Sequence, residues 1–446
     1  MPFGSTTQRP EVASLPVSRW LLVASALLVA LLLLTVVQSR AAKTPSSIEA
    51  LVPALVPVLL SDASELERGA YLVTAGNCAS CHTAPGGALM AGGLRFQTPF
   101  GALYSTNITP HPEEGIGAWT LAEFTRAMRL GERPNGEHLY PAFPYTAYTR
   151  LSDADIGAIF AFLRTLAPVS QPVPANELAF PYRPRPLLAL WTRRSLTSGP
   201  QPEEPLQSGE WHRGRYLAEA LAHCSACHSP RNALGAEDSK APYGGGLLVD
   251  LVEVDKYREW SAPNLSSSAG GLGAWHKDEL ADYLHTARNR FLESFGPMNE
   301  VIMNSTRYLQ RDDVDAMAVY LKSLPAIATA PGDEPDPQVL GRGRTVYNLH
   351  CGTCHLPTGA GDPQMGPRLN QGSLVVLDGN PASMINAILY GPQAPEPPLP
   401  EKWRHPMGEF QYELSDAEVA AVATYVRNSW QNRAGVVTEA QVAAQR

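Results

Sequence analysis

The chain has 446 residues, of which 44% are apolar and 17% are charged. This composition is ordinary for a globular protein and leaves room for about three domains of ~150 residues. The formal net charge of −8 at pH 7 disfavours nucleic acid as a partner. The 40 prolines are concentrated between the segments that we predict to be domains.

An apolar run from Trp20 to Val37 follows an N-terminus that contains two arginines. Its length approaches the ~20 residues with which a helix crosses a bilayer, and it exceeds the ~7–15 apolar residues of a usual signal peptide. We therefore predict a transmembrane anchor or an uncleaved signal at 20–37, behind a disordered N-terminus at 1–19. Ser39-Arg40-Ala41 also fits a signal-peptidase site, so a removed signal peptide is the alternative.

One pattern of predicted elements then occurs three times. It begins with a helix-like segment that contains an Arg-Gly pair, continues through Cys-x-x-Cys-His and a long loop, and ends in a second helix. The closing helices are expected at 156–166, 314–324 and 419–430, where acidic residues precede apolar residues at helical spacing. Few strands are expected, because no sustained period-two alternation occurs. The sequence thus predicts a mainly α protein with domains at 62–168, 208–325 and 336–434, and disorder in the last dozen residues.

All six cysteines belong to the Cys-x-x-Cys-His motifs. They are Cys78 and Cys81 before His82, Cys224 and Cys227 before His228, and Cys351 and Cys354 before His355. This motif attaches haem c: two thiols one helical turn apart bind the vinyl groups of one porphyrin, and the adjacent imidazole binds the iron. A dithiol redox pair would not explain the histidine, and a zinc ribbon needs two pairs ~15–20 residues apart. We predict three covalent haem c groups, attached on the periplasmic side of the inner membrane.

A methionine thioether is the expected sixth ligand, because it closes the iron and raises its potential. Met298 follows Gly296-Pro297, and Met407 follows His405-Pro406, each between a haem motif and the closing helix. We predict these two as iron ligands. Four other methionines are interpreted as core residues: Met303, Met317, Met365 and Met384.

The first repeat departs from this rule. A Gly-x-Gly-Ala-Trp block occurs in the first two repeats, and Met298 lies 23 residues after Trp275. The same count from Trp119 reaches Ala142, next to Phe143, and neither side chain can bind iron. His138 is the preferred sixth ligand by its chemistry, and an open iron is the alternative. Weaker candidates are Met90, His111 and Met128.

From 66 to 432 the chain resembles the triple-haem cytochrome c subunits of membrane-bound bacterial dehydrogenases that oxidise alcohols, gluconate, sorbitol or fructose. The resemblance rests on the Gly-Ala-Trp blocks and on the motifs at 104–110, 139–142, 296–298 and 425–430. It implies three class-I-like cytochrome c domains in tandem behind an N-terminal membrane helix. It further implies an electron-transfer subunit that accepts electrons from a dehydrogenase catalytic subunit and passes them to ubiquinone or a terminal oxidase.

In that family a methionine often stands where this chain has Phe143. The form Tyr-Pro-Ala-Phe-Pro-Tyr at 140–145, with the segment 180–188, is similar to cytochromes paired with molybdenum hydroxylases of the nicotinate, isoquinoline or aldehyde type. Two alternatives stay open. One is a haem enzyme that reduces peroxide or oxidises a small sulfur compound at an open first haem, and the other is a free periplasmic electron carrier.

Overall fold

The computed structural model describes residues 64–253, 256–328, 332–392 and 407–446. The predicted membrane segment at 20–37 and the N-terminus at 1–19 lie outside these ranges. Within the described ranges, no helix combines the length and the apolar character that crossing a bilayer requires.

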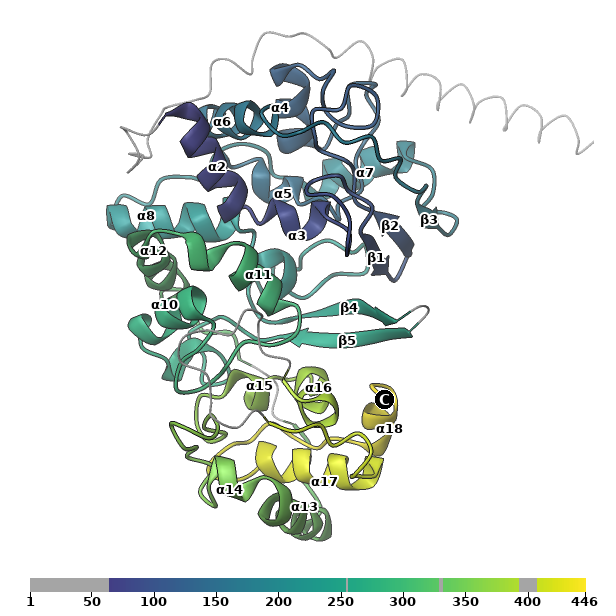
Figure 1. Cartoon of the computed structure of the whole chain (residues 1–446). Coiled ribbons are helices and arrows are strands. Elements are labelled where there is room, and N and C mark those ends of the chain that lie inside the picture. Colours follow the sequence, from purple (N-terminus) through teal and green to yellow (C-terminus); the bar gives the residue numbers. More distant parts are fainter. Residues whose placement is uncertain (1–63, 254–255, 329–331, 393–406) are drawn as a thin grey trace, which may run out of the picture. The chain divides into compact units, whose positions relative to one another are not determined.

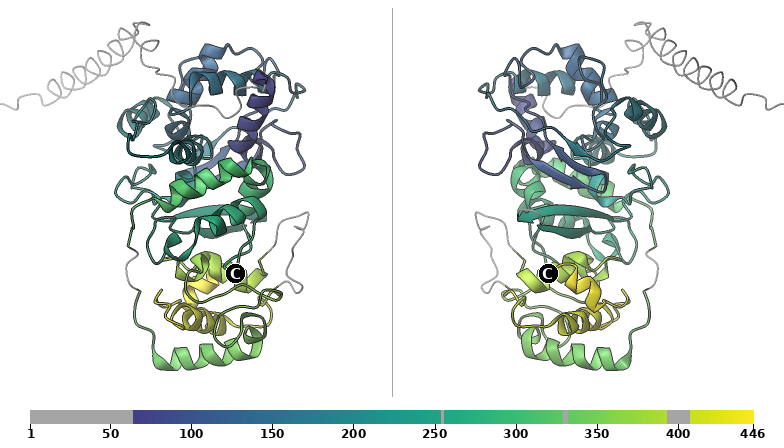
Figure 2. Two further views of the ribbon diagram at one scale, coloured as in Figure 1. Left: turned by 90° about the vertical axis from the view of Figure 1, so that its left-hand side faces the viewer. Right: turned by 90° about the vertical axis from the view of Figure 1, so that its right-hand side faces the viewer.

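Three helical repeats make up the described chain, and each contains a pair of crossing helices (Figure 1). We name them repeat 1 (64–168), repeat 2 (208–325) and repeat 3 (336–446). The pairs are α2 (Glu65–Ala75) with α6 (Asp153–Leu163), α8 (Gly209–Arg215) with α12 (Arg311–Lys322), and α13 (Pro337–His350) with α17 (Asp416–Arg427). Figure 2 shows from two further sides that α13 and α17 lie side by side. The mainly helical character that the sequence predicts is confirmed.

The remaining elements surround these pairs or connect them. In repeat 1 they are α3 (Cys78–His82), β1 (Arg95–Thr98), β2 (Gly101–Tyr104), α4 (Leu121–Leu130) and α5 (Tyr145–Tyr148), followed by β3 (Glu177–Leu178) and α7 (Pro186–Ser195) in the linker. In repeat 2 they are η1 (Tyr216–Leu221), α9 (Ser225–His228), β4 (Gly246–Glu253), β5 (Lys256–Ala262), η2 (Leu272–Ala274), α10 (Lys277–Thr286), α11 (Met298–Asn304) and η3 (Thr306–Tyr308). In repeat 3 they are α14 (Gly352–His355), α15 (Leu374–Leu377), α16 (Ala382–Tyr390) and α18 (Glu439–Ala443).

Side-chain caps explain where the closing helices begin. Ser152 accepts a hydrogen bond from the backbone N–H of Asp155, and Ser415 accepts one from Glu418. Each cap satisfies a backbone donor that has no partner inside its helix. Helices α6 and α17 therefore begin at Asp153 and Asp416, whereas α12 begins at Arg311 without a side-chain cap. All three begin three residues before the predicted apolar starts and end two or three residues earlier than predicted.

A glycine permits the close approach of the two helices in every repeat. A Cβ atom built on Gly69, Gly214 or Gly343 would lie 2.1, 1.9 or 2.1 Å from a carbonyl oxygen of the facing helix. The oxygens belong to Ala158, Ala316 and Ala421, respectively. No side chain fits at such distances, so the Arg-Gly pair in the sequence marks the point where the helices cross.

The spacing from this glycine to the first cysteine differs among the repeats. It is nine residues in repeat 1, ten in repeat 2 and eight in repeat 3. Repeat 2 continues α8 as the π-helix η1, whose wider turn takes up one extra residue. In repeat 3, α13 runs directly into Cys351, whereas Asn77 and His223 adopt positive φ before the cysteines of the other repeats.

Short antiparallel strands form two sheets. The sequence predicted that strands are few, but it did not predict the position of any of them. One sheet has the order β1-β2-β3, and the other is the hairpin of β4 and β5, which starts with Gly246 opposite Ala262. The hairpin also meets repeat 3, since Ser261 of β5 and Ser383 of α16 exchange hydrogen bonds. The β5 strand therefore helps to position the third repeat.

One apolar core is continuous through repeats 1 and 2 and also contains Leu374 of repeat 3, and a second core lies within repeat 3. The prediction of disorder in the last dozen residues was wrong. Helix α18 lies there, Val442 is completely buried, and Arg446 donates to Asp416 at 2.7 Å. Two buried valines, Val437 and Val442, and the hydrogen bonds of Tyr390 and Arg446 hold this segment in place.

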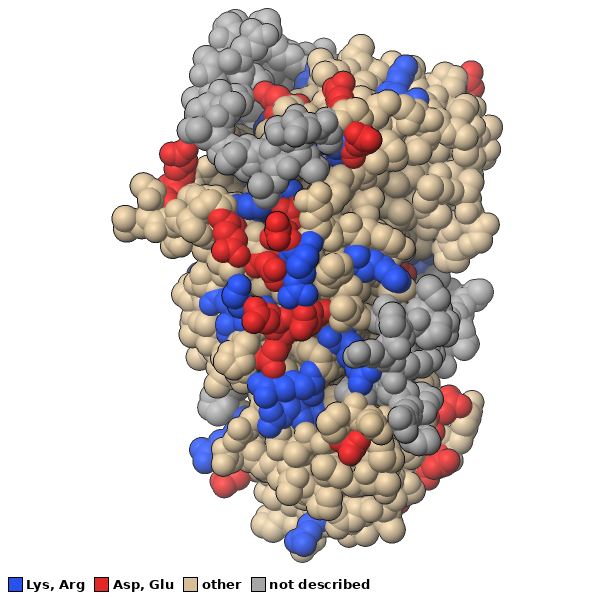
Figure 3. Space-filling model, turned by 60° about the vertical axis from the view of Figure 1, so that its left-hand side comes forward, with Lys and Arg blue, Asp and Glu red and all other residues tan. Residues whose placement is uncertain are grey.

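Charged side chains of α10 and α12 form ion pairs at the surface. Arg311 contacts Asp282 at 2.7 Å and Asp315 at 3.0 Å, and 43% of its side chain is exposed. Acidic and basic residues alternate in the middle of the face drawn in Figure 3. Exposed pairs of this kind stabilise a protein by about 0–1 kcal/mol each.

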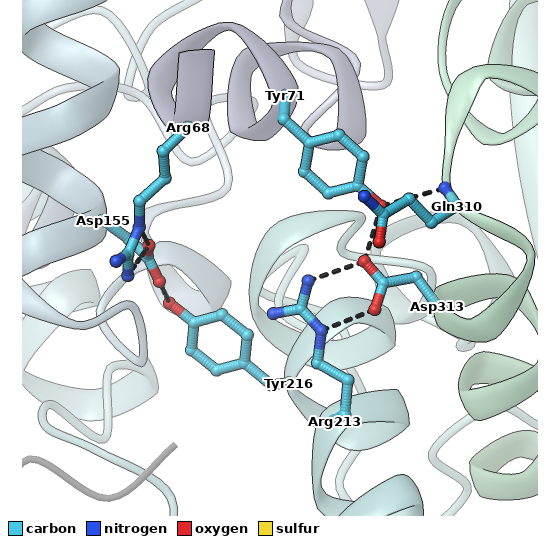
Figure 4. Close-up of polar contacts among 7 residues, drawn as sticks. All are labelled: Arg68, Tyr71, Asp155, Arg213, Tyr216, Gln310 and Asp313. Atoms are coloured by element: carbon cyan, nitrogen blue, oxygen red, sulfur yellow. Dashed lines mark hydrogen bonds and ion pairs between the residues drawn. The ribbon is translucent and has the colours of Figure 1, made fainter. Parts of the chain in front are cut away.

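Figure 4 shows two ion pairs within repeats 1 and 2 that are much less exposed. Arg68 contacts Asp155 at 2.6 Å, and Arg213 contacts Asp313 at 2.6 Å with 8% and 3% of their side chains exposed. Each aspartate also accepts a hydrogen bond from a tyrosine of the other repeat. Tyr71 donates to Asp313 at 2.5 Å, and Tyr216 donates to Asp155. We call these six residues the tyrosine clasp.

The tyrosine clasp is reciprocal, as in a symmetric dimer interface. Tyr71 lies two residues after Gly69, and Tyr216 lies two residues after Gly214. The backbone N–H groups of Gln310 and Ser152 donate to these tyrosine oxygens at 3.2 and 3.1 Å. Two equivalent surfaces thus meet with exchanged roles, which is the mark of an isologous contact.

Candidate haem sites

Each Cys-x-x-Cys-His motif ends in a short helix, with its histidine at or near the C-terminus. The helices are α3, α9 and α14, and no cysteine of the six is in a disulfide. The structure therefore brings together each predicted pair of thiols and its imidazole. It does so three times, on the segment that directly follows the first crossing helix.

Every motif histidine is oriented by the same kind of hydrogen bond. Nδ1 of His82 lies 2.6 Å from the Thr106 carbonyl oxygen, and Nδ1 of His228 lies 2.8 Å from that of Pro263. Nδ1 of His355 lies 2.7 Å from the carbonyl oxygen of Pro367. A carbonyl only accepts, so Nδ1 carries the proton and the lone pair of Nε2 is free to bind a metal. Burial lowers the pKa of all three imidazoles, which favours this neutral form.

The cysteines lack the character of a reactive dithiol. Burial raises the pKa of Cys78, Cys224 and Cys351 to about 12. A redox-active pair needs a thiolate with a lowered pKa, so this interpretation of the motif loses support. Within the described ranges, no three His, Cys, Asp or Glu side chains gather as metal ligands.

A cavity in repeat 3 joins its predicted site residues. Its volume is about 200 Å³, and its mouth opens to solvent. The cavity wall includes the motif residues Cys351, Cys354 and His355 together with Met407. A thioether and an imidazole therefore meet at one apolar space that suits a porphyrin. Met365 and Met384, interpreted from sequence as core residues, also line this cavity.

Residues of repeat 2 complete the same cavity, which the sequence did not predict. Phe291, Glu293 and Phe295 line it from the hairpin after α10. The contact is fixed by Trp275, which stacks on Phe291 at 5.2 Å and donates from Nε1 to the Gly372 carbonyl oxygen at 2.7 Å. The tryptophan of the Gly-Ala-Trp block thus secures repeat 2 to the loop beside the third motif.

The first two motifs lie close to each other at the contact of repeats 1 and 2. Ser80, between the cysteines of the first motif, accepts a hydrogen bond of 2.8 Å from Asn304 of α11. Burial raises the pKa of Cys81, and electrostatic repulsion by a Cys227 thiolate would raise it further, so these two side chains are near neighbours. Tyr148 and His223 also pack edge to face, with ring centroids 5.6 Å apart. Groups attached to these motifs would therefore lie near each other.

Met298 is the first residue of α11, directly after Pro297, and packs against the core. Hairpin hydrogen bonds show which residue replaces it in repeat 1. The N–H of Ser294 donates to Ala287, and the N–H of Leu139 donates to Gly131. Four residues further along each chain segment stand Met298 and Phe143. Phe143 thus occupies the methionine position, one residue beyond the position that the count from Trp119 reached.

The other sixth-ligand candidates of repeat 1 lie in different settings. His138 is half-buried, its carbonyl accepts from Arg185 at 2.7 Å, and its Nδ1 has no hydrogen-bond partner within the described residues. His111 uses Nδ1 to accept from the backbone of Glu114 at 3.1 Å. Met90 and Met128 are buried, with 4% and 6% exposure. The assignment of His138 stays a prediction.

The repeated motif helices and the matching family model define the class of protein, a c-type cytochrome. The model named Cytochrome c matches residues 66–167 and 340–430.

Two relatives identify the branch of this class. The chain is 36% identical to the cytochrome c subunit of the quinone-dependent alcohol dehydrogenase of Gluconacetobacter polyoxogenes, over 86% of this chain and 84% of that protein. It is 41% identical to a subunit of the nicotinate dehydrogenase of Pseudomonas putida, over 82% of this chain but 30% of that longer protein. The chain belongs to the family of dehydrogenase cytochrome c subunits, and the resemblance found in the sequence is confirmed.

One relative is named for two haems, whereas this chain contains three haem motifs. The chain is 36% identical to a diheme cytochrome c-type protein of Cereibacter sphaeroides, over 59% of this chain and 87% of that protein.

Proposed function

We propose that this chain is an electron-transfer subunit that carries three haem c groups, one in each of three tandem cytochrome c domains. It would accept electrons from a dehydrogenase catalytic subunit and pass them to ubiquinone or a terminal oxidase. The observation that carries the proposal is the triple occurrence of one arrangement. Two cysteines lie beside a neutral histidine whose Nδ1 proton is held by a backbone carbonyl.

The chain's residues have distinct tasks in this function. Haem c, when bound, supplies a one-electron couple at its iron. The cysteine pairs hold it covalently, and the histidines are pre-oriented to bind the metal through Nε2. At the cavity of repeat 3, the apolar side chains of Ile388 and of Phe291 from repeat 2 would shield the group from water. A fixed and shielded site changes little between the oxidised and reduced states, which favours rapid electron transfer.

The middle repeat decides the haem count, because the family model matches only the repeats on either side. Repeat 2 has the same glycine-mediated helix crossing as the other two. Its His228 has the same Nδ1 hydrogen bond to a carbonyl. These two features support a third haem domain at 208–325.

The partner and the location are further parts of the proposal. Identity is higher to the nicotinate dehydrogenase subunit than to the alcohol dehydrogenase subunit, at 41% against 36%. This difference and the motif at 140–145 favour a catalytic partner of the molybdenum hydroxylase kind. An anchor at 20–37 would hold the domains at the periplasmic face of the inner membrane, beside the quinone pool.

The haem count can be tested on the full chain purified from membranes. We expect the intact mass to exceed that of the polypeptide by three haems, and the reduced protein to show the visible bands of haem c. The double variant Cys224→Ser/Cys227→Ser should lose one haem, while Ser225→Ala, inside the same motif, should keep all three. A wild-type mass with two haems would refute the proposed count. Co-purification should also recover a dehydrogenase catalytic subunit.

Phe143 favours a second candidate function, a haem enzyme that acts on peroxide or a small sulfur compound at an open first iron. A phenylalanine at the ligand position leaves the iron without the expected thioether. Carbon monoxide added to the reduced protein tests this function. Binding of one carbon monoxide per chain supports an open iron, and absence of binding refutes it.

A further inference from the structure

The helix before each ligand loop offers a second position near the haem site. Helices α4, α10 and α16 are each followed by a residue with positive φ: Gly131 (63°), Ala287 (62°) and Gly391 (70°). Three residues before each of these, on the buried face, stand Met128, Leu284 and Ile388. The three side chains therefore occupy equivalent positions in the three repeats.

Repeat 3 shows what this helical position faces. Ile388 lines the cavity that also contains His355 and Met407. The end of its helix is next to the ligand loop, since a Cβ atom built on Gly391 would lie 3.1 Å from the carbonyl oxygen of Met407. The N–H of Phe410 also donates to the Ile388 carbonyl at 3.1 Å. The helical position and the loop methionine are thus neighbours on the wall of one site.

In repeat 1 the methionine stands at the helical position and not at the loop position. The helical residue is aliphatic where the loop supplies methionine, as in Leu284 with Met298 and Ile388 with Met407. In repeat 1 the helical residue is Met128, and the loop residue is Phe143. Phe143 packs on Tyr148 with ring centroids 5.4 Å apart, so the ring occupies space that a loop methionine would need.

Other candidates in repeat 1 are less well placed. Met90 lies on the side of His82, because its N–H donates to Thr83 and its carbonyl accepts from Ile108. His82 already supplies the ligand on that side. The residue of repeat 2 equivalent to His138 is Glu293, one position before Ser294. Glu293 lines the cavity of repeat 3, so this position faces a neighbouring repeat.

We propose that Met128 is the sixth ligand of the iron in repeat 1, in the role that Met298 and Met407 have in the other repeats. This inference rests on the proposed haem of repeat 1. The thioether of Met128 closes that iron, so the first haem transfers electrons and does not bind peroxide or a sulfur compound. The exchange keeps one sulfur and one larger apolar group at the two positions, which preserves the packed volume.

Proton NMR of the reduced, full-length, three-haem protein tests the assignment. Ring current shifts the methyl signal of an iron-bound methionine far upfield, so we expect three such signals in the wild type. Met128→Leu should leave two signals and raise carbon monoxide binding from zero to one per chain. Met317→Leu, at a buried methionine of α12, is the matched control and should keep three signals. Adding Phe143→Met to Met128→Leu should restore the third signal.

Two results would overturn the assignment: two upfield signals in a wild type whose mass shows three haems, or three signals retained in Met128→Leu. The wild-type spectrum decides even where a variant does not fold. A wild-type mass with fewer than three haems would instead refute the proposed function, so the two failures are distinguishable.

Discussion

Repeats 1 and 2 differ from repeat 3 in how they meet a neighbour, although all three share one helix crossing. The tyrosine clasp joins the first two repeats through two buried aspartates. Repeat 3 has Thr345 at the tyrosine position and Glu418 at the aspartate position. It is attached to repeat 2 through the indole N–H of Trp275 and through β5 instead. Formation of a repeat and pairing of repeats therefore depend on different residues.

Loss of one clasp carboxylate should give the largest effect. Asp313→Asn leaves the buried Arg213 without its ionic partner, and we expect the free energy of unfolding to fall by about 3–5 kcal/mol. Glu418→Gln at the equivalent, exposed position of repeat 3 is the control and should cost less than ~1 kcal/mol. Denaturant unfolding of the haem-loaded protein measures both. Equal losses would show that the clasp is no more important than the surface of repeat 3.

Asp378 of repeat 3 should make the stability of the folded protein depend on pH. Burial raises the pKa of this carboxyl from 3.8 to about 6. Between these values the unfolded chain loses the proton that the folded chain keeps, so stability falls as pH rises. We expect a decrease on the order of 2–3 kcal/mol between pH 4 and 6. Asp378→Asn should remove it, as thermal unfolding against pH would show. An unchanged pH profile in that variant would contradict the assignment.

The shared helix crossing can be tested within one helix of repeat 3. Gly343→Ala places a methyl group against the Ala421 carbonyl, and we expect a loss of about 1–3 kcal/mol. Gly341→Ala, two residues earlier in α13, meets no atom within 4 Å and should stabilise the helix by up to ~1 kcal/mol. Thermal denaturation compares the two variants. Opposite signs are expected, and a similar loss from both would exclude the crossing as the cause.

Removal of the tyrosine hydroxyls should cost no more than the substitution at the helix crossing. Tyr71→Phe and Tyr216→Phe each remove one hydrogen bond to a carboxylate, and each should cost about 1–3 kcal/mol, with the lower end more typical of a hydroxyl deletion. Reciprocity predicts nearly equal losses. The double variant shows whether the two halves act independently, since additive losses mean independent sites. A large loss from only one of the two would contradict the symmetry of the clasp.

Local signals were sufficient for the closing helices and for the haem motifs. The serine caps and acidic residues located α6 and α17, because capping acts within one turn. The motif placed each thiol pair beside its histidine, because all three groups lie on one short helix or directly before it. By contrast, β4 and β5 have no alternating pattern, since their pairing depends on neighbours that are distant in sequence.

The sequence by itself determined that there are three Cys-x-x-Cys-His motifs between paired helices, because these features depend on spacing along the chain. Only the tertiary structure showed that Tyr71 and Tyr216 exchange carboxylate partners, that Phe291 lines the cavity of another repeat, and that Met128 is equivalent to Ile388. These relations join residues far apart in the chain. They depend on how the packed surfaces of different repeats meet, and the spacing of residues along the chain does not reveal those contacts.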